Sequence, residues 1–111
     1  MTNKWILATA AVLLAGAMPA STVIAGPSMS SAWKSITVDQ DRCIEKGSSS
    51  MKAQRFTTRF EVLGNSSIYG ELGDYTALIR CASEKGIAYF VVSGPKGDLC
   101  SKYMNSMRDD F

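Results

Sequence analysis

The stretch YTALIRCASEKGIAYFVVS, residues 75–93, decides the fold. Two runs rich in β-branched and aromatic residues, 75–81 and 87–93, flank the polar segment SEKG at 83–86. Runs of this length and composition on either side of a short polar connection predict a β-hairpin. We therefore expect two antiparallel strands here, and we expect them to form the centre of the sheet.

The residues before this hairpin predict three more strands. From Phe56 to Leu63, polar and apolar residues alternate with a period of two, which is typical of a strand. A further strand covers about 67–71, and the turn residues 72–74 (LGD) lead the chain into the strand that begins at Tyr75. The segment from Trp33 to Val38 is short and rich in β-formers, so it predicts the first strand.

Two helices complete the pattern. Asp39 is placed to cap a helix that runs to about Arg55, and Asp98 is placed to cap a closing helix after the loop 94–97. The apolar stripe of the first helix is thin: Cys43, Ile44, Gly47 and Met51. One side of the closing helix carries Leu99, Cys100, Tyr103, Met104, Met107 and Phe111. The order β-α-β-β-β-β-α predicts an α+β domain over 33–111, an antiparallel meander sheet with two helices packed on one face.

Residues 1–25 have the pattern of a secretory signal peptide. Lys4 precedes an apolar core from Trp5 to Met18. Val23 and Ala25 then supply small or medium residues at the minus three and minus one positions that signal peptidase recognises. We expect cleavage after Ala25, with Ala20 as the second choice, and a product in the periplasm or outside the cell. The apolar core has about 14 residues where a bilayer span needs roughly 20, so an uncleaved anchor is the less favoured alternative.

Cleavage after Ala25 removes 25 of the 111 residues and leaves 86, enough for one domain. Residues 26–32 (GPSMSSA) have linker composition and predict a flexible arm. Lys4 is the one charged residue removed, so 11 basic residues remain against 10 acidic ones. This balance does not favour nucleic acid or an anionic membrane as a partner. We expect membrane contact only through the signal peptide before it is cleaved.

Export determines how the three cysteines are interpreted. An oxidising compartment favours one disulfide and one odd thiol. Following each chain reversal through the predicted helix and strands brings Cys43 and Cys81 to the same end of the sheet, so we predict a Cys43–Cys81 disulfide and a buried free thiol at Cys100. If residues 67–82 formed one unbroken strand, the same tracing would place Cys43 beside Cys100 instead.

Several short segments resemble a set of small exported bacterial proteins of unknown function. The resemblance spans nearly all of the chain after residue 25, and it rests on Trp33, Cys43, the segment from Tyr69-Gly70 to Gly73-Asp74-Tyr75, Ile79-Arg80-Cys81 and Val92-Ser93-Gly94-Pro95. In those relatives a helix cysteine and the cysteine after the Ile-Arg pair recur, which agrees with the predicted pairing, whereas a counterpart of Cys100 is not usual. The resemblance implies a fold and no activity.

The chain lacks the residues that most reactions need. It contains no histidine, which removes the usual general base and the commonest metal ligand. The S-x-x-K match at Ser49 to Lys52 comes without the other two motifs of serine β-lactamases. Three cysteines without a C-x-x-C pair or an imidazole do not make a zinc site. We therefore expect no catalytic residue, no cofactor, no metal and no enzymatic activity.

One face of the central hairpin is the predicted binding surface. If Cys81 pairs across from Ile87, the face that turns away from the helices carries Leu78, Arg80, Phe90 and Val92, together with Thr76 and Ala88. Contiguous exposed apolar surface of this kind indicates self-association or a protein partner. The sequence thus predicts an exported protein-binding or self-associating module. The alternative is that the arm around Trp33, or the tail next to the signal peptide, folds over this face and covers it.

A second candidate function comes from Cys100 and the loop 94–98. A helix N-terminus lowers the pKa of a thiol and its free amides hold anions, so this region would suit a thiol-based or small-anion-binding function. Core packing beside Tyr103 and Met104 is the plainer interpretation of Cys100.

Overall fold

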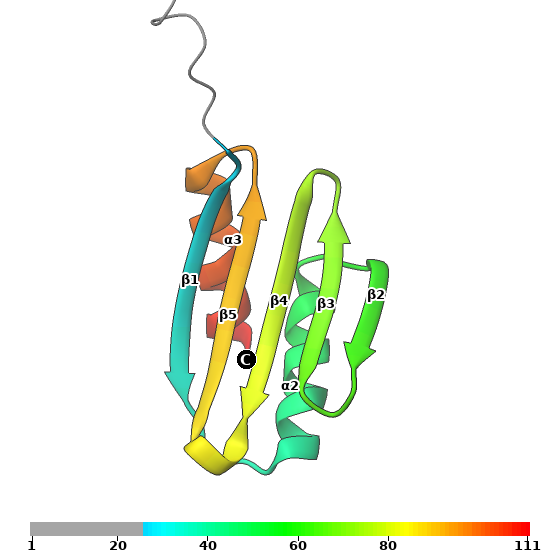
Figure 1. Ribbon diagram of the computed structural model, residues 1–111, viewed down its shortest axis with the longest axis vertical. Coiled ribbons are helices and arrows are strands. Elements are labelled where there is room, and N and C mark those ends of the chain that lie inside the picture. Colours follow the sequence, from blue (N-terminus) through cyan, green and yellow to red (C-terminus); the bar gives the residue numbers. More distant parts are fainter. Residues whose placement is uncertain (1–25) are drawn as a thin grey trace, which may run out of the picture.

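The computed structural model describes residues 26–111 (Figure 1), so the predicted signal peptide lies outside the described residues. Within them, the chain forms a five-stranded antiparallel sheet with two α-helices and one short 3-10 helix, which confirms the predicted α+β class. The strands lie in the spatial order β1-β5-β4-β3-β2. The elements are β1 (Ser28–Ser35), α2 (Gln40–Ala53), β2 (Thr58–Leu63), β3 (Ser67–Leu72), β4 (Tyr75–Ala82), η2 (Ser83–Lys85), β5 (Ile87–Gly94) and α3 (Gly97–Asp110).

Both helices cover the same face of the sheet, and the core lies between them and the strands. Helix α3 packs on β1 and β5, and α2 packs on β3 and β4 (Figure 1). Aromatic edge-to-face contacts join the layers: the ring centroids of Phe90 and Phe111 are 5.5 Å apart, and those of Tyr75 and Tyr103 are 5.4 Å apart. The buried apolar residues are Cys43, Met51, Phe56, Ile68, Ala77, Ile79, Cys81, Ala88, Phe90, Val92, Cys100, Met104, Met107 and Phe111.

Strand β1 begins at Ser28, so the prediction of a flexible arm over 26–32 is wrong from that residue on. All eight residues of Ser28–Ser35 pair with β5 in one continuous antiparallel ladder. Two of the serines that suggested a linker, Ser28 and Ser30, are small enough to lie under α3: the hydroxyls of Ser30 and Ser101 are 2.7 Å apart. Pairing with a well-formed neighbour has overridden the weak strand propensity of this segment.

The hairpin of β4 and β5 is one residue out of the predicted register. Ala82 pairs with Ile87 and Cys81 with Ala88, because the loop consists of η2 and Gly86. Gly86 closes this loop with a φ of 69°, a left-handed conformation that glycine adopts without a Cβ clash. Since side chains alternate between the two faces of a strand, a shift of one residue exchanges the faces of β5.

Strand β2 starts at Thr58 rather than at Phe56, and it contains a β-bulge. Phe56 is buried in the core at the end of α2, where its amide donates to the Met51 carbonyl at 3.1 Å. The register between β2 and β3 shifts between Thr58 and Glu61, and Arg59 has a φ of 49° there. The bulge interrupts the alternation that the sequence suggested for this strand.

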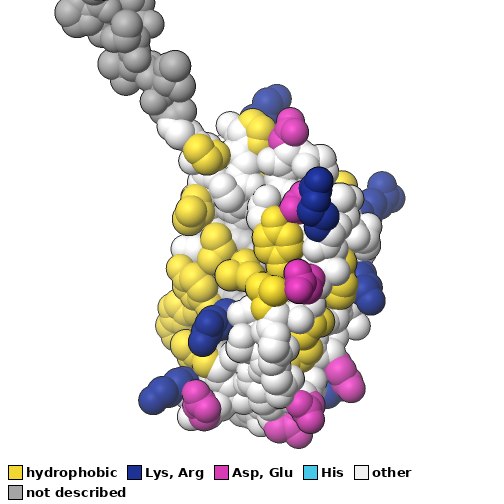
Figure 2. Space-filling model, turned by 45° about the vertical axis from the view of Figure 1, so that its right-hand side comes forward, with side chains coloured by type: hydrophobic (Ala, Val, Ile, Leu, Met, Phe, Trp, Pro, Cys, Tyr) yellow, Lys and Arg dark blue, Asp and Glu magenta, His cyan; other side chains and the backbone are white. Residues whose placement is uncertain are grey.

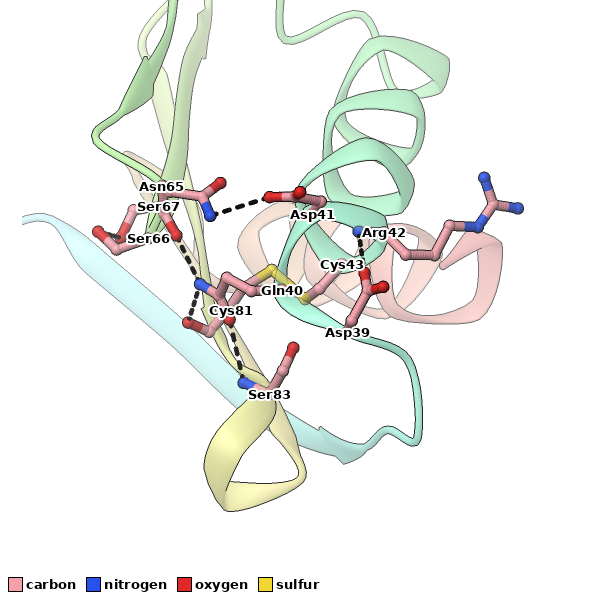
Figure 3. The surroundings of a disulfide bond; sticks show 10 residues. All are labelled: Asp39, Gln40, Asp41, Arg42, Cys43, Asn65, Ser66, Ser67, Cys81 and Ser83. Atoms are coloured by element: carbon pink, nitrogen blue, oxygen red, sulfur yellow. Dashed lines mark hydrogen bonds between the residues drawn. A yellow bond between two sulfur atoms is a disulfide. The ribbon is translucent and has the colours of Figure 1, made fainter.

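The predicted Cys43–Cys81 disulfide is present, and it joins the fourth residue of α2 to the end of β4 (Figure 3). Gln40 reinforces this junction, because its amide nitrogen donates to the carbonyls of Asn65 at 2.6 Å and Cys81 at 2.9 Å, and its side-chain oxygen accepts from the amide of Ser83 at 3.1 Å. Asp39 caps α2 as predicted, since its carboxylate accepts from the Arg42 amide at 2.8 Å.

Candidate functional site

The sheet face opposite the helices is the candidate site. Antiparallel register brings its side chains into rows that cross the strands. One row runs from Trp33 through Tyr89 to Arg80, and the next runs from Ser31 through Val91 and Leu78 to Tyr69. Directly paired residues of an antiparallel sheet lie on the same face with Cβ atoms about 4.5–5.5 Å apart, so each row is a line of neighbouring side chains.

Of the four residues predicted for this face, the structure places two here and two in the core. Leu78 and Arg80 lie on the open face, in half-buried and exposed positions. Phe90 and Val92 are fully buried on the helix face, so their assignment to the binding surface was wrong. The physical reason is the hairpin register: Phe90 pairs with Ile79, and Val92 pairs with Ala77.

Tyr89 and Val91 occupy the positions that Phe90 and Val92 were predicted to fill. Sequence alternation could not choose between them, because both sides of β5 are apolar. Loop length was the signal that could have decided it. Pairing Ala82 with Ile87 leaves the loop 83–86, whereas the expected pairing of Cys81 with Ile87 leaves one residue more.

The face carries large apolar side chains that no described element covers. Met29 is 70% exposed, Trp33 is 61% exposed and Tyr89 is 41% exposed. Hydrophobic side chains gather on the β1 side of the molecule at the left of Figure 2. The chain around Trp33 does not fold over the hairpin face as the alternative supposed, because β1 lies beside β5 and extends the same sheet. Met29 and Trp33 therefore enlarge the apolar surface.

Arg80 is the basic residue of β4 on this face. Its pairing residue in β5 is Tyr89, and its side chain makes no ion pair within residues 26–111. An exposed guanidinium beside apolar side chains is free to bind a carboxylate in a bidentate manner.

A polar cluster lies on the β2 side of the same face. Glu71 accepts a hydrogen bond from the Tyr69 hydroxyl at 2.5 Å and another from the Arg59 guanidinium at 2.6 Å. The hydrogen bond from Tyr69 is the main reason that the pKa of Glu71 is lowered, and Arg59 adds to the effect. The same hydrogen bond raises the pKa of Tyr69. The Glu71 carboxylate is thereby held ionised and already has two partners.

Cys100 is a buried free thiol, as the core-packing interpretation predicted. It is 0% exposed, and its sulfur lies 3.8 Å from the carbonyl oxygen of Ser28. Burial raises the pKa of this thiol and the nearby Asp98 carboxylate adds to the rise, which is opposite to the effect expected from the helix dipole. Asp98 is not the cap of α3, because that position belongs to Lys96 and its side chain makes no capping hydrogen bond.

The helix side has surface hollows without converging reactive groups. One of about 530 Å³ lies between α2 and the end of α3, and its lining includes Arg42, Lys46 and Asp110. Within residues 26–111, no cluster of three or more cysteine and carboxylate side chains has the spacing to bind a metal ion. No helix in this part of the chain has the length and hydrophobicity to span a membrane.

Comparison with known proteins does not assign this chain to a family. No protein-family model matches this chain, and no curated protein sequence is similar to it.

Proposed function

We propose that residues 26–111 are an exported, non-enzymatic module that binds a protein through the open face of the sheet. The observation that carries this proposal is the group of exposed apolar side chains from Met29 and Trp33 on β1 to Tyr89 on β5, on a face that neither described helix covers. Contiguous apolar surface of this kind on a small domain is typical of an interaction site. Aromatic residues such as Trp33 and Tyr89 are the residue types that contribute most to protein interfaces.

The charges of the face indicate the chemistry of the partner. Arg80 makes no ion pair within the described residues, whereas Arg59 is bonded to Glu71. A partner with an apolar surface and one carboxylate opposite Arg80 would satisfy both the apolar side chains and the free guanidinium. We therefore favour a protein of that composition over a second copy bound face to face.

Export to the periplasm or outside the cell is part of the proposal. Residues 1–25 have the sequence pattern of a cleavable signal peptide, with the cut after Ala25. The Cys43–Cys81 disulfide supports the same destination, because disulfides persist in oxidising compartments and are rare in reducing ones.

A photo-crosslinking amino acid at position 89 tests the binding face in the cell that produces the protein. We expect a discrete crosslinked partner from position 89, since Tyr89 lies on the apolar face. The same amino acid at exposed Ser49, on the outer side of α2, is the control and should give no such product. Arg80→Glu should abolish the crosslink from position 89, whereas Arg42→Glu, the same charge change on α2, should leave it unchanged.

Two results would contradict this proposal. Equal products from positions 89 and 49 would show that the face has no particular affinity. Products from position 89 that contain this chain alone and no other protein would contradict it as well.

A further inference from the structure

We infer that strand β1 is a pairing edge for a second copy of this chain, joined antiparallel so that the two sheets become one. This pairing would use the outer edge of β1 and would cover parts of Met29 and Trp33, while Arg80 and Tyr89 on the inner strands stay available to another protein. It follows from the difference between the two edges of the sheet, from the direction of the β1 backbone groups, and from the residues that self-pairing would bring together.

The two edges of the sheet are protected to different degrees. The β2 edge has a β-bulge, the left-handed residue Arg59, and the exposed charges of Arg59 and Glu61. Such features prevent a sheet edge from pairing with another chain. The β1 edge has none of them within Ser28–Ser35: the strand pairs without a register shift, contains no proline and has one charged residue, Lys34.

Lys34 does not protect the edge. Its side chain lies on the helix side, where its ammonium group donates to the Arg108 carbonyl at 3.0 Å and lies 5.7 Å from the centroid of the Phe111 ring. A charge held under the sheet by α3 cannot repel an approaching strand as an outward lysine would. An eight-residue edge of regular geometry is therefore left open to another strand.

The backbone groups of alternate β1 residues point outward. The Ile36 amide donates to the Gly86 carbonyl at 2.9 Å, so the amide and carbonyl of every second residue before it also face β5. The residues between them direct these groups away from β5: Met29, Ser31, Trp33 and Ser35. Within residues 26–111, β5 is the one strand paired with β1, so these groups are available to a second chain.

If two copies pair with Ser31 at the centre, their outward backbone groups face each other and their apolar side chains come into contact. With Ser31 opposite Ser31 of the other copy, Met29 lies opposite Trp33, and each of these residues presents outward amide and carbonyl groups. Direct cross-strand pairs share a face, so both Met29–Trp33 pairs form on the open face. Contact between a thioether and an aromatic ring is favourable, and it covers parts of the two most exposed apolar side chains of the described chain.

The contact is expected to be reversible. One edge strand from each copy is a smaller contact than the roughly 1,200–2,000 Å² buried in stable complexes. A trapping experiment is therefore more decisive than a measurement of mass alone.

Cysteine trapping tests the register. The protein is produced from the full 111-residue chain and oxidised with a glutathione buffer. In the Ser31→Cys variant the two introduced residues would face each other, with Cα atoms about 5.5 Å apart, a separation that a disulfide spans. We expect most of this variant to become a disulfide-linked dimer. The Met29→Cys variant and the unaltered protein, whose Cys100 is buried, should stay unlinked.

Proline substitution tests the backbone. Ser31→Pro removes an outward amide and leaves the bonds to β5 intact, so the monomer should fold. Light scattering at high protein concentration should show a concentration-dependent dimer for the unaltered protein and only monomer for this variant. Ser31→Thr keeps the amide and should keep the dimer. Linking that is no greater for Ser31→Cys than for Met29→Cys would overturn the inference. So would a dimer that Ser31→Pro leaves unchanged.

Discussion

Glu71 shows how single residues set the charge of the open face. It accepts hydrogen bonds from Tyr69 and Arg59, and the pKa of its carboxyl group is lowered chiefly by the Tyr69 hydroxyl. Arg59 reaches it from a left-handed position in the bulge of β2. Because Arg59 is engaged by Glu71, Arg80 on β4 is the arginine of this face whose guanidinium has no ion pair within the described residues.

Tyr69→Phe should raise the pKa of Glu71 toward the ordinary value of a carboxyl group, because the donor that most favours the ionised form is removed. A carboxyl group with a lowered folded-state pKa contributes stability above its ordinary pKa, and this stability is lost as the pH falls through the folded-state value. The variant should therefore lose less stability on acidification. An NMR titration of the Glu71 side chain measures the pKa, with Tyr89→Phe as the control. An unchanged value in Tyr69→Phe would assign the shift to Arg59.

At the scale of elements, Gly70 allows the chain to cross β3 on its way from α2 to β2. A Cβ atom at this position would lie 2.3 Å from the Phe56 carbonyl oxygen and 2.8 Å from the Met51 sulfur. The backbone oxygen cannot move aside as the end of a flexible side chain can. This close approach is how the buried Phe56 reaches the core from the segment that joins α2 to β2.

Gly70→Ala should lower the free energy of unfolding by about 1–3 kcal/mol, the usual effect of overpacking. Gly97→Ala is the matched control, because its Cβ would lie 3.4 Å from the Ser28 hydroxyl, an ordinary contact, and alanine favours the helix. Urea unfolding monitored by circular dichroism compares the two variants. Equal midpoints would show that α2 and β3 can separate without loss of stability.

At the scale of the whole molecule, the disulfide offsets the small size of the core. Cys43 and Cys81 are 38 residues apart in sequence, and they connect α2 to β4 across the two layers. Helix α2 has a narrow buried stripe made up of Cys43, Gly47, Ser50 and Met51. Little apolar area holds this helix to the sheet, so we expect its position to depend on the covalent link.

The double variant Cys43→Ala and Cys81→Ala should lose about 3–4 kcal/mol of unfolding free energy, the value for a loop of this length. A reductant should have the same effect on the unaltered protein. Cys100→Ala is the control: it keeps the disulfide, so its stability should still fall when reductant is added. A reductant without effect on either protein would show that packing alone holds α2 in place.

Much of the fold was predictable because it is encoded locally. The turn at Gly73 and the polar loop before Ile87 mark the central strands, and Asp39 marks the start of α2. The disulfide followed from the order and length of these elements. Strand β1 was not predictable over its whole length, because its serines carry no strand signal and it forms by pairing with β5.

The sequence by itself determined the α+β order, and it favoured the Cys43–Cys81 pairing over Cys43–Cys100 and the burial of Cys100 over an exposed thiol. These features depend on the composition and order of the helices and strands, and short-range sequence patterns are enough to predict both. The tertiary structure alone decided which side of β5 is the surface. Both sides of β5 are apolar. The length of the loop before Ile87 sets the hairpin register, and this register places Phe90 and Val92 in the core and Tyr89 on the exposed face. Successive side chains of a strand alternate between its two faces, so a shift of one residue exchanges the side chains of the open face without changing any element.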